Sequence, residues 1–426
     1  MTTFLITIVL ILLAIYGTPL FAIISAIALL AWHFDGTSLA TVIVDLYRLA
    51  SQPVLLAIPL FTLAGYMLAE SNAPKRLIDF AQAIFGWIPG GLSIVALTSC
   101  ALFTAFTGAS GVTIIALGGL LYPMLIKESY PEKFTLGMIT TSGNLGMLFP
   151  PSLPIIVYGL IAEVSIDKLF LAGLIPGTLL IVLLSAYSIW YIKDQKVATV
   201  PFEFSRAWKA TKGAIWELPL PLLILVGIYG GFFTATEAAA VTAFYVLIVE
   251  VFIYRDISLT KDLPNIMKES MVLVGGILVI LGAALGMANY MIDAEIPTAI
   301  LDFMKQYVDS KIVFLLMLNI FLLIVGALMD IFSAILVIVP LIIPIAINYG
   351  VDPVHLGIIF LTNLEIGYIT PPVGINLFIS SFRFGKPITQ LYSASFPFLI
   401  ILLIALMIIT YVPELSLFLV DIFIPE

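Results

Sequence analysis

Two stretches of this 426-residue sequence end in a double proline: Ser142-Gly-Asn-Leu-Gly-Met-Leu-Phe-Pro-Pro151 and Thr362-Asn-Leu-Glu-Ile-Gly-Tyr-Ile-Thr-Pro-Pro372. Each proline lacks a backbone N–H and clashes with the preceding helical turn, so carbonyl groups near residues 143–149 and 365–370 lose their helical partners. In lipid, such groups persist only where protein buries them or where they line a wet cavity. Pro150, Pro151, Pro371 and Pro372 therefore predict two broken helices that serve a function.

The composition identifies a membrane protein. Apolar residues make up 62% of the chain and charged residues only 10%, whereas soluble domains carry about 25% charged residues. The apolar runs are long enough to cross a hydrocarbon core of roughly 30 Å. The first run, from Phe4 to Trp32, is too long for a signal-peptide core and is predicted to be a retained helix. We therefore expect an all-α polytopic membrane protein.

The same composition excludes several kinds of site. The single cysteine, Cys100, cannot form an internal disulfide or a thiolate metal site, and the chain has only two histidines. No run of basic residues resembles a nucleic-acid-binding face. We expect no organic cofactor, no transition metal and no nucleic-acid partner.

Two apolar segments, residues 91–126 and 312–348, are too long for one straight span. Each has a small or polar interruption near its middle, at residues 107–111 and 329–333. We interpret both as re-entrant hairpins of two half-length helices. Loops are predicted near residues 33–52, 72–90, 127–133, 161–168, 193–216, 255–268, 293–311, 349–354 and 382–390.

The distribution of lysine and arginine supports this threading. With two hairpins and nine full spans, and with residues 193–216 in the cytoplasm, fourteen of the 18 Lys and Arg residues lie on the cytoplasmic side, as the positive-inside rule requires. The N-terminus is then cytoplasmic, and the C-terminus lies outside. The first hairpin enters from the cytoplasm and the second from the periplasm of a bacterial inner membrane.

The two hairpin regions form an internal repeat. Pro123 and Pro344, Gly137 and Gly357, and the two double prolines are each separated by 220 to 221 residues. Because the hairpins enter from opposite sides, the repeats are inverted in topology, an architecture in which transporters build a midplane site from broken helices. We expect scaffold helices at 1–90, a first transport repeat at 91–160, scaffold or arm helices at 161–311, a second repeat at 312–381, and a C-terminal helix at 382–426.

The residues around the breaks indicate the ligands. Free carbonyls together with Ser, Thr and Asn oxygens suit a small hard cation such as sodium. The positive ends of half-helices at the hairpin tips suit a carboxylate. Asp330 lies at the second tip, and a carboxylate at membrane depth is a functional candidate because its burial is costly. The residues alone leave sodium and proton coupling open, since Asp330 and Glu365 can both carry protons.

The sequence resembles the large membrane subunit of the tripartite ATP-independent periplasmic (TRAP) transporters. The resemblance covers essentially the whole chain and rests on residues 142–159, 170–177, 326–330, 352–357 and 369–378. It implies an elevator-type, sodium-coupled importer of organic acids. It also implies two partners: a periplasmic substrate-binding protein and a small four-helix membrane subunit, expected here as a separate chain.

The resemblance also implies two sodium sites. The first would use Gly108, Ser110, Ser142, Gly143, Asn144 and Gly146, and the second Asp330, Ser333, Gly367 and Thr370. Substrate contacts are expected from Ser110, Asn144, Asn363 and Thr370. Family members often have Gly-Ser-Ser at the first tip, whereas this chain has Gly108-Ala109-Ser110. One hydroxyl is missing there, and backbone carbonyls could serve in its place.

Two alternatives remain. A stand-alone sodium–dicarboxylate symporter of similar inverted-repeat design would share these features. A rhomboid-like intramembrane protease would use the Gly108-Ala109-Ser110-Gly111 motif with His355, but catalysis would need Ser110 and His355 within hydrogen-bond reach. The threading places these residues on different sides of the membrane, so we expect no enzyme.

Overall fold

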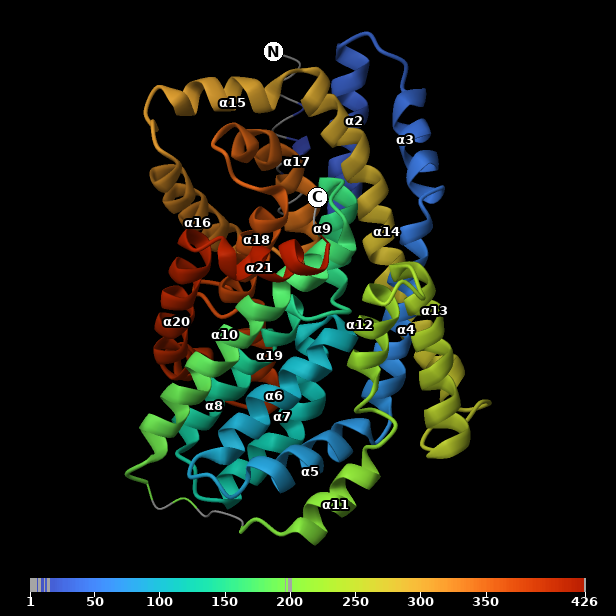
Figure 1. Cartoon of the computed structure of the whole chain (residues 1–426). Helices are drawn as coiled ribbons and strands as arrows, with labels where there is room; N and C mark the ends of the chain where they lie inside the picture. Colours follow the sequence, from blue (N-terminus) through green and yellow to red (C-terminus); the bar gives the residue numbers. More distant parts are fainter. Residues whose placement is uncertain are drawn as a thin grey trace.

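A computed structural model describes residues 6, 9–10, 12–13, 16–195, 197 and 201–424, and no strand occurs among them. The chain is a bundle of helices (Figure 1). In chain order these are α2 (Leu20–Phe34), α3 (Ala40–Ala50), η1 (Pro53–Leu56), α4 (Ala57–Glu70), α5 (Ala73–Phe85), α6 (Gly91–Thr107), α7 (Ser110–Lys127), α8 (Glu132–Ser142), η2 (Leu145–Leu148), α9 (Leu153–Ala162), α10 (Ile166–Ile192), α11 (Phe204–Gly213), α12 (Leu220–Tyr229), α13 (Ala235–Ile248), η3 (Val249–Ile253), α14 (Leu263–Asp293), α15 (Ile296–Lys305), α16 (Lys311–Leu328), α17 (Ile331–Asn348), α18 (Pro353–Gly367), α19 (Ile375–Phe384), α20 (Ile388–Tyr411) and α21 (Glu414–Phe423).

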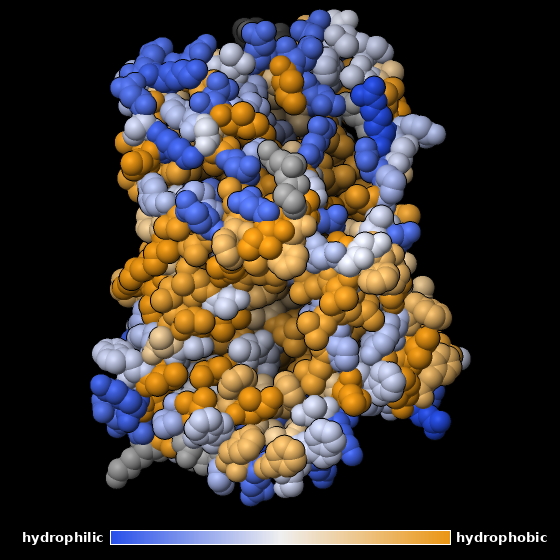
Figure 2. Space-filling model, viewed as in Figure 1, coloured by the Kyte–Doolittle hydropathy of each residue, from blue (hydrophilic) through white to orange (hydrophobic). Residues whose placement is uncertain are grey.

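The helices confirm a multi-pass membrane protein. Within the described residues, eight helices are long and apolar enough to cross a membrane, or nine if the bent pair of residues 132–148 and 153–162 counts as one span. Figure 2 shows hydrophobic side chains across the middle of the molecule and hydrophilic ones gathered toward its two ends. A hydrophobic belt between polar ends matches the thickness and polarity of a bilayer.

Both predicted hairpins are present. The first consists of α6 and α7, joined at Gly108, whose φ of 64° is a left-handed conformation that glycine adopts without a steric penalty. The second consists of α16 and α17, joined at Met329 and Asp330. Each limb has 17 or 18 residues and is therefore about 26 Å long. The two limbs of each hairpin divide the predicted segment nearly equally, because two residues are enough to connect them.

Both predicted broken helices are also present. Helix α8 ends at Ser142, the 3₁₀ turn η2 follows, and α9 then leaves at an angle of 45°. Helix α18 ends at Gly367, and residues 368–374 separate it from α19. Both double prolines contain a cis peptide bond.

Some sequence predictions need correction. The predicted loops at 33–52, 72–90, 193–216 and 293–311 contain helices α3, α5, α11 and α15, because the polar residues that suggested loops are spread along helical segments. The predicted helix from Phe4 to Trp32 lies partly outside the described residues. Its described part is interrupted before α2, where Gly17 has a φ of 82° and Pro19 precedes the first helical residue.

The amphipathic helices lie at the ends of the bundle. Helices α5 and α11 lie at the lower end in Figure 1, and α15 lies at the upper end. The sequence assigns the segments that contain α5 and α11 to the cytoplasm and the segment that contains α15 to the periplasm. The predicted cytoplasmic and periplasmic segments therefore occupy opposite ends of the molecule.

Arg76 connects α5 to residues 217–256 through ion pairs. Arg76 pairs with Glu217, with Glu250 at 2.9 Å and with Asp256 at 2.5 Å. Its guanidinium also lies 3.8 Å from the ring centroid of Tyr254. Burial raises the pKa of Glu217. Burial also acts to raise the pKa of Asp256, but hydrogen bonds from Asn72 and Arg76 outweigh it and hold that pKa below its usual value. The cluster holds α5, which leads into the first hairpin, against residues 217–256.

Candidate functional site

The first tip lies against the first break. The Thr104 hydroxyl on α6 donates to the Gly143 carbonyl at 2.8 Å and lies 2.7 Å from the Thr113 hydroxyl on α7. A Cβ on Gly143 would lie 3.3 Å from the Ser110 carbonyl oxygen. The Ser142 hydroxyl donates to Ile139 O in its own helix, at 3.1 Å. The structure therefore brings together the tip and the break that the sequence assigns to the first sodium site.

The first tip also bonds to the second repeat. The Ser110 hydroxyl donates to Asn376 Oδ1 at 2.7 Å, and Asn376 Nδ2 lies 3.5 Å from the Thr140 carbonyl. The Thr140 hydroxyl donates in turn to Ser380 Oγ at 2.9 Å. These four side chains are buried and join α7, α8 and α19. Sequence reasoning missed Asn376, although it lies four residues after Pro372 within the motif that carries the family resemblance.

Three helix N-termini meet at the first tip. Ser110 begins α7, and its partner Asn376 is the second residue of α19. A Cβ on Gly108 would lie 2.6 Å from the side chain of Leu153, the first residue of α9. No side chain caps any of these three N-termini. At α19 the Asn376 N–H donates to the Tyr368 carbonyl at 3.1 Å and the Leu377 N–H donates to the Gly374 carbonyl at 2.8 Å. The positive dipole ends of the three helices still favour an anion at this place.

The second tip is built differently. The Asp330 carboxylate caps α17: it accepts hydrogen bonds from the backbone N–H groups of Phe332 and Ser333, both at 3.0 Å, and from the Ser333 hydroxyl. The Ile331 N–H donates to the Tyr368 hydroxyl of the second break at 2.8 Å. The Thr370 hydroxyl donates to Ile366 O at 2.8 Å. The residues predicted for the second sodium site thus lie at one tip and the adjacent break.

Glycine allows each break to approach its hairpin. A Cβ on Gly146 would overlap the backbone of Ala101 and Ala105 on α6. A Cβ on Gly367 would overlap the backbone of Gly326 and Ala327 on α16. These equivalent contacts, one in each repeat, explain why both predicted site glycines lack a side chain.

Asn144 joins the two breaks. Its Nδ2 donates to the backbone carbonyl of Glu365. Its Oδ1 is buried and has no hydrogen-bond partner among the residues that the structure describes. The Glu365 side chain also lies in the interior, and its Oε1 has no partner either.

Asn363 is placed elsewhere. Its Nδ2 donates to Asn319 Oδ1 and to Ile359 O, both at 2.8 Å, and Asn319 Nδ2 donates to the Thr410 hydroxyl at 3.0 Å. This network lies between α16, α18 and α20. The structure therefore does not bring Asn363 to Ser110, Asn144 or Thr370, with which the sequence groups it as a substrate contact.

The protease alternative requires a contact that does not form. His355 Nδ1 lies 3.1 Å from the Ser416 hydroxyl, and its Nε2 lies 3.2 Å from the Thr410 carbonyl. Ser110 bonds to Asn376 instead. No serine–histidine pair is available at the first tip, as the sequence-based threading predicted.

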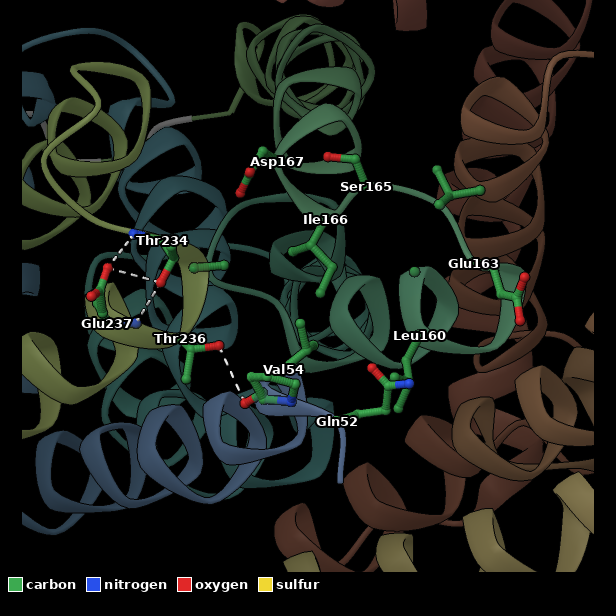
Figure 3. Close-up of a pocket in the computed structure, with 14 residues that line it drawn as sticks. Gln52, Val54, Leu160, Glu163, Ser165, Ile166, Asp167, Thr234, Thr236 and Glu237 are labelled. Atoms are coloured by element: carbon green, nitrogen blue, oxygen red, sulfur yellow. Dashed lines mark hydrogen bonds between the residues drawn. The ribbon is translucent and has the colours of Figure 1, made fainter. Parts of the chain in front are cut away.

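A separate pocket of about 770 Å³ opens between residues 52–54, 159–167 and 234–237 (Figure 3). Three carboxylates, those of Glu163, Asp167 and Glu237, line it. Glu237 is already used to cap α13, where it accepts from the Thr234 N–H at 2.8 Å. None of the residues predicted to hold sodium or substrate lines this pocket. Its acidic lining would repel an organic anion, so it does not fit a substrate site for a carboxylate.

Comparison with known proteins gives consistent matches over the chain. Residues 4–415 match the family described as "Tripartite ATP-independent periplasmic transporter, DctM component". The chain is 40% identical over 385 residues to the C4-dicarboxylate TRAP transporter large permease protein DctM of Pseudomonas aeruginosa, covering 90% of each. It is 36% identical over 373 residues to the isethionate TRAP transporter permease protein DctMQ of Oleidesulfovibrio alaskensis, covering 85% of this chain and 58% of that protein.

The fold also resembles a solved structure. The crystal structure of the YdaH transporter of Alcanivorax borkumensis, described as having an unusual topology, matches with a TM-score of 0.57. The match covers 87% of each chain at 15% sequence identity. At this identity the likeness concerns the arrangement of helices alone.

Proposed function

The chain belongs to the DctM family of tripartite ATP-independent periplasmic transporters, and we propose that it is the membrane subunit through which an organic acid enters the bacterial cell, driven by sodium. A C4-dicarboxylate is the first substrate to test, because the 40%-identical relative is named for that class. A second relative is named for isethionate, a sulfonate. What these two substrate classes share is an anionic head group.

The observation that carries this proposal is the meeting of three uncapped helix N-termini at Gly108–Ser110. The N-termini of α7, α9 and α19 bring three positive dipole ends to one place. An anion held there needs no buried lysine or arginine. The second break offers access to this place, because Pro371, Pro372 and Val373 are exposed next to α19.

Sodium coupling draws on oxygen atoms at the same tips. The Asn144 Oδ1 atom is buried without a donor, which is costly unless a cation or a further donor satisfies it. We propose it as a ligand of the first sodium site with backbone oxygens of the first break. At the second site, Asp330 and Thr370 offer side-chain oxygens, and the Asp330 carboxylate brings a full negative charge.

An elevator movement requires the tips and breaks to slide as one block past a stationary scaffold. The first hairpin and the two broken helices are bonded to one another through Ser110–Asn376 and Asn144–Glu365, and the second hairpin is bonded to the second break through Ile331–Tyr368. Scaffold helix α4 meets this block at Gly65, where a Cβ would overlap the backbone of Phe106 and Thr107. A smooth backbone contact of this kind supports sliding between the two parts.

The word tripartite in the family description supports two partners: a periplasmic binding protein and a small membrane subunit. The experiment is uptake of labelled succinate into proteoliposomes that hold both membrane subunits. Uptake should require an inward sodium gradient and the binding protein. Uptake without the binding protein would instead establish the stand-alone symporter.

The same assay tests the ion sites. Asp330→Ala and Ser110→Ala should each raise the sodium concentration needed for half-maximal uptake by about tenfold or more, the effect of losing roughly 1.4 kcal/mol of binding free energy. The matched control is Glu237→Gln, which removes a carboxylate far from the tips. Wild-type sodium dependence in both tip variants would refute the proposed ion sites.

A further inference from the structure

A second pocket, of about 650 Å³, opens beside the second break. We refer to it as the α7–α19 groove. Its volume lies within the ~300–1,000 Å³ that small-molecule sites usually have. Arg383, in the last turn of α19, adds a positive charge to the lining. The apolar part of the lining comes from the break at Val373 and Ile375, from α19 at Phe378, Ile379 and Phe382, and from α7 at Ile115.

The spacing of residues on the two helices builds this groove. On α7, Gly111 and Gly119 lie four residues before and after Ile115, so the three share one face of the helix. A Cβ on Gly111 would lie 2.8 Å from the end of the Ile379 side chain, and a Cβ on Gly119 would lie 2.0 Å from a guanidinium nitrogen of Arg383. The two glycines therefore let side chains of α19 cross α7, and Gly119 leaves the space in which the guanidinium lies.

Arg383 has no acidic partner in this position. The neighbouring Lys386 pairs with Glu132, which also accepts a hydrogen bond from the Tyr122 hydroxyl at 2.8 Å. Arg383 belongs to none of the ion pairs among the residues that the structure describes. A guanidinium carries a permanent charge and a planar set of donors that matches a carboxylate. The groove therefore offers an organic anion a positive charge that no acid of the described chain neutralises.

The groove adjoins the place where the three helix N-termini meet. Its α7 wall begins at Gly111, the residue after Ser110. Its α19 wall begins at Ile375, the residue before Asn376, which accepts the Ser110 hydrogen bond at 2.7 Å. Arg383 lies seven residues beyond Asn376, or about 10 Å along the helix. The sequence-based threading assigns Arg383 to the cytoplasmic side, so the groove leads from the proposed anion site toward the cytoplasm.

We propose that the α7–α19 groove is the cytoplasmic exit path of the transported anion, and that Arg383 is the positioning residue that draws the anion along it. An anion that passes an apolar wall loses part of its hydration, which is costly. A fixed positive charge near the mouth offsets this cost and raises the local concentration of anions. The proposal rests on the proposed function, because an exit path presupposes an organic anion at the helix N-termini.

Cysteine labelling tests the charge of the groove and needs no transport. In a Cys100→Ser background, Phe378→Cys places a thiol in the groove, five residues from Arg383 and thus about 7.5 Å along α19. At low ionic strength, one charge at this distance speeds an anionic reagent and slows a cationic one by roughly threefold each. Adding Arg383→Gln should therefore lower the ratio of labelling rates for sulfonate-bearing and trimethylammonium-bearing methanethiosulfonates about tenfold.

Arg255→Gln is the matched control for this labelling. Arg255 is another exposed arginine that the threading places on the cytoplasmic side, and it does not line the groove. The ratio should stay at its wild-type value in this variant. An unchanged ratio in Arg383→Gln would overturn the proposal, and would do so even if Arg383→Gln lowered the heat stability of the protein by removing a cation from the end of α19.

Succinate uptake into proteoliposomes tests the exit path. Arg383→Gln should lower the maximal rate about tenfold without raising the external succinate concentration needed for half-maximal uptake, because Arg383 acts after the anion has left the outer side. Arg383→Lys keeps the charge and should recover most of the rate, and Arg255→Gln should match the wild type. A raised half-maximal concentration with an unchanged maximal rate would place Arg383 on the external side and overturn the exit path.

A lipid head group is the other source of an anion for this groove. In phosphatidylcholine nanodiscs, succinate should slow the labelling of Phe378→Cys by both reagents, and Arg383→Gln should weaken this protection. Protection by added phosphatidylglycerol, with none by succinate, would make the groove a lipid site and overturn the proposal. If the wild-type complex takes up no succinate, the proposed substrate class fails, whereas the ratio of labelling rates still decides whether Arg383 sets the charge of the groove.

Discussion

The first double proline is buried, whereas Pro371 and Pro372 of the second repeat are exposed. The difference arises from the segment that comes after each break. Helix α9 begins two residues after Pro151 and packs against α17 of the other hairpin. In the second repeat the chain stays non-helical through Gly374, whose φ is 54°, before α19 packs against α7. Two similar sequence motifs therefore differ in the exposure of their double prolines.

The hairpin tips differ in a parallel way. Ser110 at the first tip bonds to Asn376 in the opposite repeat. Asp330 at the second tip bonds to the first turn of its own helix. The first tip is thus part of the connection between repeats, while the second tip is locally satisfied. Sequence symmetry describes how the helices are built, but it does not make their partners equivalent.

The largest expected loss of stability comes from adding a side chain at the glycine that brings each break against its hairpin. Gly146→Ala and Gly367→Ala should each destabilise the protein by about 3 kcal/mol, because the added methyl overlaps backbone that cannot move aside. Gly275→Ala is the matched control, since a Cβ there meets nothing within 4 Å. Survival of the monodisperse protein after heating in detergent measures the effect. If only one of the two variants is unstable, the close approach is not a common feature of the repeats.

A smaller effect should distinguish the tips. Ser110→Ala leaves the buried Asn376 Oδ1 without its donor and should cost about 2 kcal/mol. Ser333→Ala leaves Asp330 with two backbone donors and should cost about 0.5 kcal/mol. The same heating assay compares them. Equal stabilities would mean that the bond between repeats contributes no more than a local one.

The smallest expected effect is a difference between the two breaks in the rate at which a cysteine placed there is labelled. In a Cys100→Ser background, Val373→Cys should react with a water-soluble maleimide about tenfold faster than Ser152→Cys, since a buried thiol reacts only after local opening. Val373 is 36% exposed and Ser152 is fully buried, at equivalent positions of the two repeats. Labelling rates followed by mass spectrometry give the answer. Comparable rates would show that both breaks open to water.

Some features of the fold follow from local sequence. A proline has no N–H wherever it lies, so both helix breaks were predictable from Pro150-Pro151 and Pro371-Pro372. The hairpins were predictable because the apolar segments 91–126 and 312–348 are each too long for one straight span. The helices at residues 40–50, 73–85, 204–213 and 296–305 were not predicted, because charge and hydropathy indicate where a span ends but not how the polar segment between spans folds.

In the candidate site, too, local sequence indicated some residues and missed others. Gly146 and Gly367 stood out from their place in repeated motifs, and each lies at a break, against the backbone of a hairpin limb. Asn376 did not stand out, because its partner Ser110 is 266 residues away in sequence. Asn363 shares the motif of the second break, yet its amide faces Asn319 rather than the tips.

The sequence by itself determined that the chain lies in a membrane, that its two repeats break at double prolines, and which oxygen-bearing residues surround the breaks. These properties depend on hydropathy and on the backbone chemistry of proline, which act over a few residues. Only the tertiary structure decided that the first break is enclosed, that the second is open, and that Glu365 lies without a counter-charge where they cross. Burial depends on which distant helices pack against a residue, and local sequence does not specify those neighbours.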